Sequence, residues 1–273
     1  PRMPQLADPS HAPESTLSNP IVSAVLKNHA KNAKTACILI CDITRPVPNS
    51  LILGPIIRKL MTLGIQSEQI TILIATGLHR PNEGKELEEL IGDPWVLENA
   101  KVENHFARDD GAHIEMGTTK KGNRILLDRR FVSADVRIVT GLVEPHFMAG
   151  YSGGRKVIAP GVAHAETITT FHSARYMEDP LATNCNLDGN PLHEDQLEIV
   201  EMVGGALAMN VVIDEFRNLS FINFGEIISS HLEAVAFIRK YAEVKVPRRF
   251  KTVLTSCAGH PLDLTYYLSL IHI

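Results

Sequence analysis

The chain has 273 residues, of which 44% are hydrophobic and 21% are charged, and its formal net charge is −4. This composition is typical of globular proteins, and the length suits one large domain or two. The slightly acidic charge gives no electrostatic case for nucleic acid, and no apolar run approaches the roughly 18–20 residues of a membrane span. We therefore expect neither nucleic acid nor a membrane as a partner.

The N-terminal segment predicts a disordered tail over residues 1–17, because it contains four prolines and no periodicity. It has no apolar core of a signal peptide. Ser18, Asn19 and Pro20 predict the start of a helix, with a cap residue followed by proline in the first turn. The cysteines form no CxxC pair, so we expect reduced thiols and a cytoplasmic protein; they are Cys37, Cys41, Cys185 and Cys257.

Buried strands and helices alternate along the chain. Apolar runs predict strands over 35–41, 69–75 and 136–143, and helical spacing predicts helices over 51–63 and 83–91. This alternation predicts a Rossmann-like α/β fold, a mostly parallel sheet flanked by helices. Further expected elements are strands at 101–106, 125–131 and 209–213, and helices at 163–173, 195–207 and 225–241.

The chain divides into an expected N-terminal cofactor-binding domain, residues 18–246, and the beginning of a truncated C-terminal α/β domain, residues 247–273. Residues 244–249 are interpreted as the linker, and a new strand is expected at 251–256. Residues 268–273 back-translate to a transposon-end adapter used in sequencing libraries. Our hypothesis is that they are not native and that the natural sequence ends near Tyr267.

Polar side chains follow the first predicted strand at Asp42, Thr44 and Arg45. Arginine can grip a carboxylate or phosphate with two parallel hydrogen bonds, and an adjacent aspartate can hold it in position. The alternative interpretation is a turn with an exposed ion pair. The second strand delivers His79 to a loop, and the third delivers His146. The carboxyl ends of parallel strands lie along one edge, so these residues can line one crevice.

The segment Ser152-Gly153-Gly154-Arg155-Lys156 follows the third strand. Its glycines let backbone N–H groups approach an anion, its basic pair supplies charge, and a following helix adds its positive end. It is not a P-loop, because the Gly-x4-Gly-Lys-Ser/Thr spacing is absent. The alternative is a surface lysine near structural histidines.

Together these motifs closely resemble the nickel-dependent lactate racemase family, in order and in spacing, over roughly residues 20 to 267. They run from Asp42-Ile43-Thr44-Arg45-Pro46 through Thr76-Gly77-Leu78-His79-Arg80 and Glu144-Pro145-His146 to Ser152–Lys156 and His172.

The resemblance implies a nickel-pincer nucleotide cofactor, a pyridinium-3-thioamide-5-thiocarboxylic acid mononucleotide that holds nickel through sulfur and carbon. It implies covalent attachment at Lys156, nickel ligation by His172, and acid–base roles for His79 and His146. It also implies that Arg45, positioned by Asp42, holds the substrate carboxylate. From the residues themselves, we assign Ser152, Gly153, Gly154 and Arg155 to the cofactor phosphate, with Asp42 and Thr44 also beside the cofactor.

The implied reaction interconverts the enantiomers or epimers of a small 2-hydroxy acid. One histidine takes the hydroxyl proton while a hydride passes to the cofactor, and the ketone is then reduced on its other face. The histidine pKa near 6.5 suits both bases. Proteins that synthesise the cofactor are implied partners. The family also has a Tyr-Gln pair and a lysine at the start of its second domain. Tyr267 matches and would contact substrate, whereas Leu268 and Ile271 depart from the pattern, so this fragment alone is expected to be inactive.

Two other functions remain open. A nicotinamide-dependent oxidoreductase predicts a GxGxxG turn after the first strand, and Asp42-Ile43-Thr44-Arg45-Pro46 is not one. A carboxylate- or nickel-binding module without catalysis would keep these side chains but carry no covalent cofactor.

Overall fold

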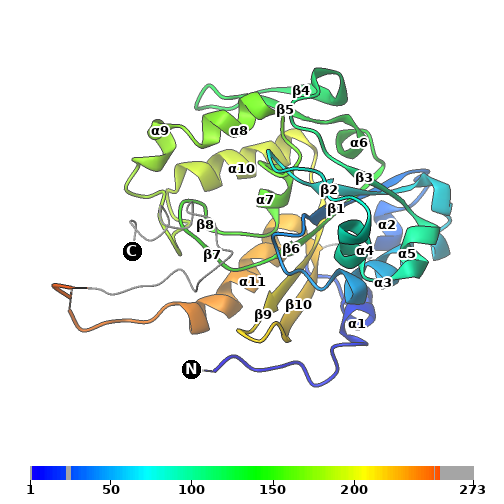
Figure 1. Ribbon diagram of the computed structural model, residues 1–273, viewed down its shortest axis with the longest axis horizontal. Coiled ribbons are helices and arrows are strands. Elements are labelled where there is room, and N and C mark those ends of the chain that lie inside the picture. Colours follow the sequence, from blue (N-terminus) through cyan, green and yellow to red (C-terminus); the bar gives the residue numbers. More distant parts are fainter. Residues whose placement is uncertain (1, 23–25, 249, 253–273) are drawn as a thin grey trace.

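A six-stranded sheet forms the centre of the molecule, and the computed structural model describes residues 2–22, 26–248 and 250–252. The strands span Ala36–Cys41 (β1), Ile70–Ala75 (β2), Lys101–Asn104 (β3), Val136–Leu142 (β6), Leu207–Ile213 (β9) and Leu219–Glu226 (β10). Their order is β10-β9-β6-β1-β2-β3, and only β9 and β10 pair antiparallel. The expected mostly parallel α/β fold is confirmed (Figure 1).

Helices cover both faces of this sheet (Figure 1). One face packs against Ala12–Ser18 (α1), Leu26–His29 (α2), Asn49–Thr62 (α3), Lys85–Ile91 (α4) and Pro94–Asn99 (α5). The other face carries Arg129–Val132 (α6), Arg155–Ile158 (α7), Ala165–Phe171 (α8), Ala174–Met177 (α9), Pro191–Met202 (α10) and Ile227–Ala242 (α11). Short pieces complete the fold: 3-10 turns at Ser67–Gln69 and Asp110–Ala112, and two-stranded ribbons at His113–Thr118 (β4) with Arg124–Asp128 (β5) and Pro145–His146 (β7) with Gly150–Tyr151 (β8).

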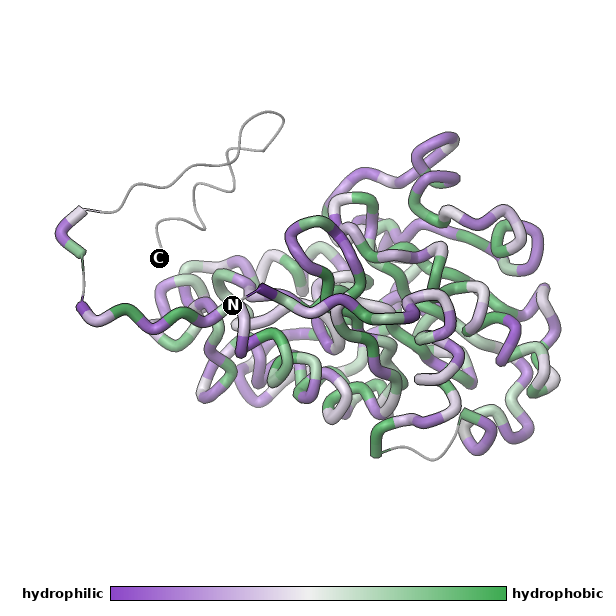
Figure 2. The backbone as a smooth tube through the Cα atoms, turned by 90° about the horizontal axis from the view of Figure 1, so that it is seen from below, coloured by the Kyte–Doolittle hydropathy of each residue, from purple (hydrophilic) through white to green (hydrophobic). Residues whose placement is uncertain are grey.

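The strand β1 shows why the sheet needs both layers of helices. Ala36, Ile38 and Ile40 join the core on one face, while Cys37 and Leu39 join the core on the other. A strand buried on both faces reads as a continuous apolar run rather than an alternating one. Figure 2 shows hydrophobic residues gathered toward the inside of the molecule and hydrophilic residues on many of the outer loops.

The N-terminal segment differs from its prediction. Residues 12–18 form α1, whose Leu17 is buried, and the backbone N–H of Leu6 donates to the carbonyl of Leu219. The expected disordered tail is therefore wrong for this segment, because apolar residues between its prolines pack against the sheet. The helix expected from Asn19 is also wrong at its start, since Ile21 forms a bridge with Gly225 of β10.

Several element boundaries differ from the sequence predictions for local reasons. The strand expected over 125–131 ends at Asp128, whose carboxylate caps α6. The helix α10 begins at Pro191 rather than 195, because Asn190 caps it. Strands β4 and β10 were not predicted; β10 carries polar residues such as Asn223 on an edge position. The strand expected at 251–256, Tyr267 and residues 268–273 lie outside the described residues.

Candidate active site

Three neighbouring strands bring the predicted polar residues to one edge of the sheet. The strand β1 pairs with β2 on one side and β6 on the other, all parallel, so their carboxyl ends lie together. Asp42, Thr44 and Arg45 follow β1, His79 follows β2, and His146 follows β6. The loop after β2 is also fixed to the segment after α7, because the N–H of Gly77 donates to the carbonyl of Gly161 at 2.9 Å.

Asp42 holds His79. Its Oδ2 lies 2.6 Å from Nδ1 of His79, and its Oδ1 accepts a hydrogen bond of 2.5 Å from the Thr44 hydroxyl. The hydrogen bond to Asp42 raises the pKa of His79. Burial opposes ionisation of Asp42, but the hydrogen bonds from His79 and Thr44 outweigh it and lower the pKa of this carboxyl. In this structure both carboxylate oxygens of Asp42 are engaged by His79 and Thr44, and only the backbone carbonyl of Asp42 binds Arg45, so the role of Asp42 in positioning Arg45 stays a prediction.

Arg45 pairs with Glu144 instead, and its Nη1 lies 3.3 Å from Glu144 Oε1. Both side chains are partly exposed, at 36% and 39%. Burial raises the pKa of Glu144, while the charges of Arg45 and Lys156 act to lower it. No role was predicted for Glu144. Its position just beyond a strand end, two residues before His146, was the feature of the sequence that could have indicated a place in the site.

His146 carries its proton on the opposite nitrogen from His79. Its Nδ1 accepts hydrogen bonds from the backbone N–H groups of Met148 and Ala149, at 3.3 and 3.1 Å. A neutral imidazole that accepts at Nδ1 carries its proton on Nε2. Burial, followed by the charges of Lys156 and Arg45, lowers the pKa of His146 well below its usual value. The two histidines are thus chemically inequivalent in this structure.

The charge of Lys156 acts on His79, Glu144 and His146. Burial and then the charge of Arg45 lower its pKa to about 8, and the nearby Arg155 also lowers it, while Cys41 and Glu144 oppose the change. None of the described residues forms a hydrogen bond or ion pair with its amine. A half-buried amine with a lowered pKa is unprotonated more often than an ordinary lysine and is a better nucleophile.

His172 ends the helix α8 as its C-terminal cap. Its Nδ1 lies 2.8 Å from the carbonyl of Ile168, an arrangement in which Nδ1–H donates and Nε2 keeps a free lone pair. Metal-binding histidines commonly use one ring nitrogen in this way, which fixes the tautomer for the other. The charge of His172 also acts on His146. The structure therefore brings His79, His146, Lys156 and His172 into one electrostatic neighbourhood.

Two residues assigned to the cofactor phosphate face inward. The hydroxyl of Ser152 donates to the carbonyl of Leu142 at 2.8 Å and accepts from the N–H of Glu144 at 3.1 Å. Arg155 is 1% exposed, and its guanidinium binds only groups inside the protein. Both side chains are engaged in fixing the turn, and the predicted phosphate role of this segment stays a prediction.

The two glycines between them allow close packing. A Cβ at Gly153, whose φ is +77°, would lie 2.6 Å from Val143 Cγ2, and one at Gly154, whose φ is +48°, would lie 2.9 Å from the ring of His231. The turn therefore needs glycine for backbone conformation and for contact with the protein beneath it. This leaves backbone N–H groups, not side chains, for any anion at this turn.

The described residues contain no group of three or more His, Cys, Asp or Glu side chains placed to hold a metal ion. Cys37, Cys41 and Cys185 are free thiols. In the same described part of the chain, no helix is both long and apolar enough to cross a membrane.

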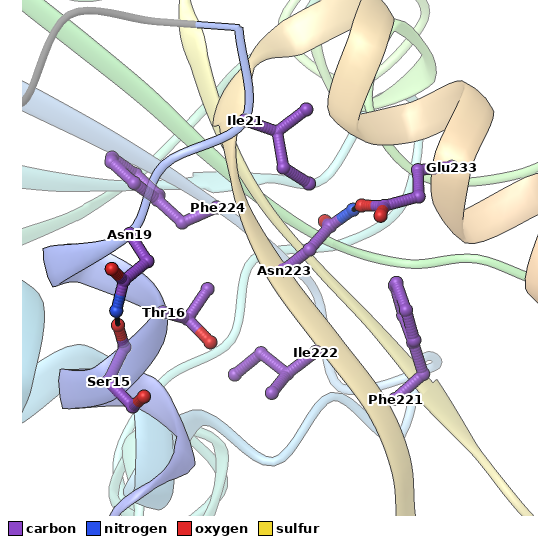
Figure 3. Close-up of a pocket in the computed structure, with 9 residues that line it drawn as sticks. All are labelled: Ser15, Thr16, Asn19, Ile21, Phe221, Ile222, Asn223, Phe224 and Glu233. Atoms are coloured by element: carbon purple, nitrogen blue, oxygen red, sulfur yellow. Dashed lines mark hydrogen bonds between the residues drawn. The ribbon is translucent and has the colours of Figure 1, made fainter.

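A separate hollow of about 260 Å³ lies on the far edge of the sheet, between α1, β10 and α11. Among the residues that line it, Figure 3 shows Asn223 of β10 and Glu233 of α11 pointing toward each other, and the amide of Asn223 donates to the carboxylate of Glu233 at 2.8 Å. None of the residues at the carboxyl ends of β1, β2 and β6 lines this hollow.

A family model described as the lactate racemase N-terminal domain matches residues 2–184, more than half of the chain. The chain belongs to the lactate racemase family. Lactate racemases from Thermoanaerobacterium thermosaccharolyticum and Lactiplantibacillus plantarum are 33% and 32% identical to it over 253 and 254 residues. The family resemblance predicted from the motifs is confirmed.

Solved structures agree with this membership. The lactate racemase apoprotein from T. thermosaccharolyticum superposes with a TM-score of 0.81 at 30% identity, over 88% of this chain and 57% of that one. A Thermotoga maritima protein shares the fold, with a TM-score of 0.70 at 22% identity, over 86% of this chain and 60% of its own. The chain spans 59% of the length of its two lactate racemase relatives.

Proposed function

We propose that this chain is the cofactor-binding part of an isomerase that interconverts the enantiomers or epimers of a small 2-hydroxy acid. The observation that carries the proposal is the arrangement of Lys156 with His79, His146 and His172 at one sheet edge, in a member of the lactate racemase family. A panel of 2-hydroxy acids would identify the substrate.

The residues present fit a nickel-pincer nucleotide at three points. Lys156 offers an amine that none of the described side chains occupies, with its pKa lowered to about 8 by burial and by Arg45. His172 offers Nε2 to a metal, because its Nδ1 is engaged by Ile168. A metal cluster of protein side chains is not required, since the pincer brings its own sulfur and carbon donors. The phosphate would be held by backbone N–H groups near Gly153 and Gly154.

When bound, the cofactor would supply the hydride acceptor and donor that the reaction needs. The chain's own residues bind the substrate and move its proton. Arg45 would grip the substrate carboxylate in competition with Glu144, its partner in the structure. His79 has Nε2 open to accept the hydroxyl proton, and Asp42 stabilises the imidazolium that results.

His146 would serve the opposite face of the substrate. In the arrangement described, its Nε2–H can donate a hydrogen bond to the substrate oxygen. To accept a proton at Nε2, it must first give up the proton it carries there and take one at Nδ1, which requires the amides of Met148 and Ala149 to release that nitrogen. We therefore propose a local rearrangement of residues 146–149 during turnover.

The test uses the full-length protein, co-expressed with the proteins that synthesise the cofactor. Each enantiomer of a panel of 2-hydroxy acids is supplied, and formation of the other enantiomer is followed by chiral chromatography. Intact mass should show an added cofactor that is lost in Lys156→Ala and kept in Lys240→Ala, a substitution on α11. An unmodified mass without interconversion would favour the binding module, and reduction of a nicotinamide would favour the oxidoreductase.

Localisation in the cytoplasm, predicted from the unpaired cysteines, stays a prediction; the free thiols of Cys37, Cys41 and Cys185 support it. The proteins that synthesise the cofactor are proposed partners, because the family resemblance implies both the cofactor and its synthesis.

A further inference from the structure

A buried cation lies directly beneath the turn that carries Lys156. The guanidinium of Arg155 donates from Nε to His193 Nδ1 at 2.7 Å and from Nη2 to the carbonyl of Ala149 at 3.0 Å. Its Nη1 lies 3.2 Å from the carbonyl of Tyr151 and 2.9 Å from Nε2 of His231. His193 belongs to α10 and His231 to α11, so one side chain ties α7 to two neighbouring helices.

This arrangement lacks the usual counter-ion. Among the described residues, no carboxylate contacts Arg155, and the two imidazoles beside it are themselves buried, at 7% and 1% exposure. Burial and the charge of Arg155 lower the pKa of His193 to about 3 and that of His231 well below its usual value. Both rings are therefore neutral; His193 accepts at Nδ1, whereas Nε2 of His231 accepts from Arg155 in one tautomer and donates to the carbonyl of Ser152 in the other. A buried charge without an opposite charge destabilises the fold unless its hydrogen bonds fully replace those it would make to water.

The turn is shaped to fit these partners. His231 Nε2 also lies 2.9 Å from the carbonyl of Ser152, and the missing Cβ of Gly154 leaves room for the His231 ring. The backbone from Ala149 to Lys156 thus wraps around the guanidinium. A planar fork with several donors can satisfy acceptors in this geometry, whereas an ammonium group cannot reach them all.

We propose that Arg155, held by His193 and His231, is a positioning residue that keeps the amine of Lys156 half-buried in the site and ready to react. The proposal rests on the proposed function, because the reactive amine matters only if Lys156 carries the cofactor. Arg155 is buried and does not reach the proposed cofactor itself. Its positive charge, which no carboxylate among the described residues neutralises, favours the neutral and reactive form of the Lys156 amine.

The groups that face Lys156 set the expected effect. Arg45, from the loop after β1, and Arg155 favour the neutral amine, while Glu144 and the thiol of Cys41 favour the charged one. The imidazoles of His79 and His146 also respond to its charge. If Arg155 loses its anchors, Lys156 should move toward solvent, and its pKa should rise from about 8 toward the ordinary lysine value of 10.5.

The experiment measures the amine directly, in the 273-residue chain without cofactor. Brief acetylation with acetic anhydride at a series of pH values, followed by peptide mass spectrometry, gives the midpoint of Lys156 reactivity. His193→Leu removes the acceptor of Arg155 Nε, whereas His193→Asn keeps an acceptor near the position of Nδ1. Arg155→Met removes the guanidinium. Arg137→Met is the matched control, because the guanidinium of Arg137, like that of Arg155, pairs with no carboxylate among the described residues; it binds the carbonyls of Gly205 and Val132 at the opposite end of β6.

We expect the midpoint near 8 to move upward in His193→Leu and Arg155→Met, so that acetylation at pH 8 slows about three- to tenfold. His193→Asn and Arg137→Met should keep the midpoint of the unaltered chain. Circular dichroism establishes that each variant is folded; if Arg155→Met is not, the His193 pair decides. A folded His193→Leu variant that melts earlier but keeps the Lys156 midpoint overturns the proposal, since Arg155 would then be only structural. Because acetylation needs no cofactor, this result is independent of the cofactor mass that tests the proposed function.

Discussion

Nδ1 of His79 lies 2.6 Å from Oδ2 of Asp42, although the two residues are 37 positions apart. Each comes from the carboxyl end of a different strand, β2 and β1, which lie side by side in parallel. The contact fixes the tautomer of His79 and leaves its Nε2 open, as the proposed acid–base role of this histidine requires.

The first prediction concerns Asp42→Asn. The pKa of His79 is raised in the folded chain. The stability that this shift contributes is therefore fully present below pH 6.5, and it is lost as the pH rises through the pKa of His79 in the folded state. The pKa of Asp42 is lowered in the folded chain. The stability that this shift contributes is present above pH 3.8, and it is lost as the pH falls through the pKa of Asp42 in the folded state. Both are present between pH 3.8 and 6.5. The loss of Tm in Asp42→Asn should be largest in that window and smaller at pH 9; an equal loss at all pH values would contradict it.

His146 should stay neutral and protonated at Nε2. Long-range ¹H–¹⁵N NMR of the imidazoles, recorded in the cofactor-free chain at pH 6.5, distinguishes the two neutral tautomers and the charged form. We expect His146 to show the Nε2–H pattern because its Nδ1 accepts from two backbone amides. His79 should show a protonated Nδ1 in the same spectra. A charged His146 at this pH would contradict the contacts described.

The turn before Lys156 should tolerate no side chain at Gly154. Gly84 is the matched control, since its φ of +55° resembles the +48° of Gly154 but nothing lies within 4 Å of its missing Cβ. Gly84→Ala should cost about 1–2 kcal/mol of unfolding free energy for the left-handed backbone alone. Gly154→Ala should cost about 1–3 kcal/mol more, because its Cβ would lie 2.9 Å from His231. Urea unfolding measures both, and equal costs would mean that His231 gives way freely.

His172→Ala should reduce nickel retention in the full-length protein loaded with cofactor. The matched control is His164→Ala at the other end of α8, where Nδ1 accepts from the N–H of Glu166 and caps the helix. Both variants remove an imidazole from the same helix, but only the first removes the proposed ligand. Nickel per protein, measured by inductively coupled plasma mass spectrometry, should fall in His172→Ala alone. A similar fall in both would indicate a general effect on α8.

Glu144→Gln should strengthen substrate binding. A substrate carboxylate would then compete for Arg45 with a neutral amide instead of the carboxylate that lies 3.3 Å away. Because the pair is partly exposed, KM should fall by no more than about fivefold, equivalent to about 1 kcal/mol. Glu115→Gln, which removes a carboxylate from the exposed Arg124 pair on the β4–β5 ribbon, should leave KM unchanged. An increase of KM in Glu144→Gln would mean that Glu144 orients Arg45 for substrate.

The order of strands and loops could be predicted from the sequence. The apolar runs that became β1, β2 and β6 are buried on both faces, a state that requires a parallel sheet between helices, and chemistry at the ends of parallel strands must share one edge. The placement of Asp42, His79, His146 and Lys156 in one neighbourhood follows from that pattern alone.

The tertiary structure alone decided which partner each of these side chains takes. Asp42 turned to His79 rather than to Arg45, and Arg155 turned inward to His193 and His231, which come from helices far along the chain. The spacing of residues in the sequence determines which strand end a residue follows. The direction of its side chain depends on the hydrogen-bond acceptors that the packed helices place nearby. Burial then sets the charge of each group, because desolvation acts only once the core has closed around it.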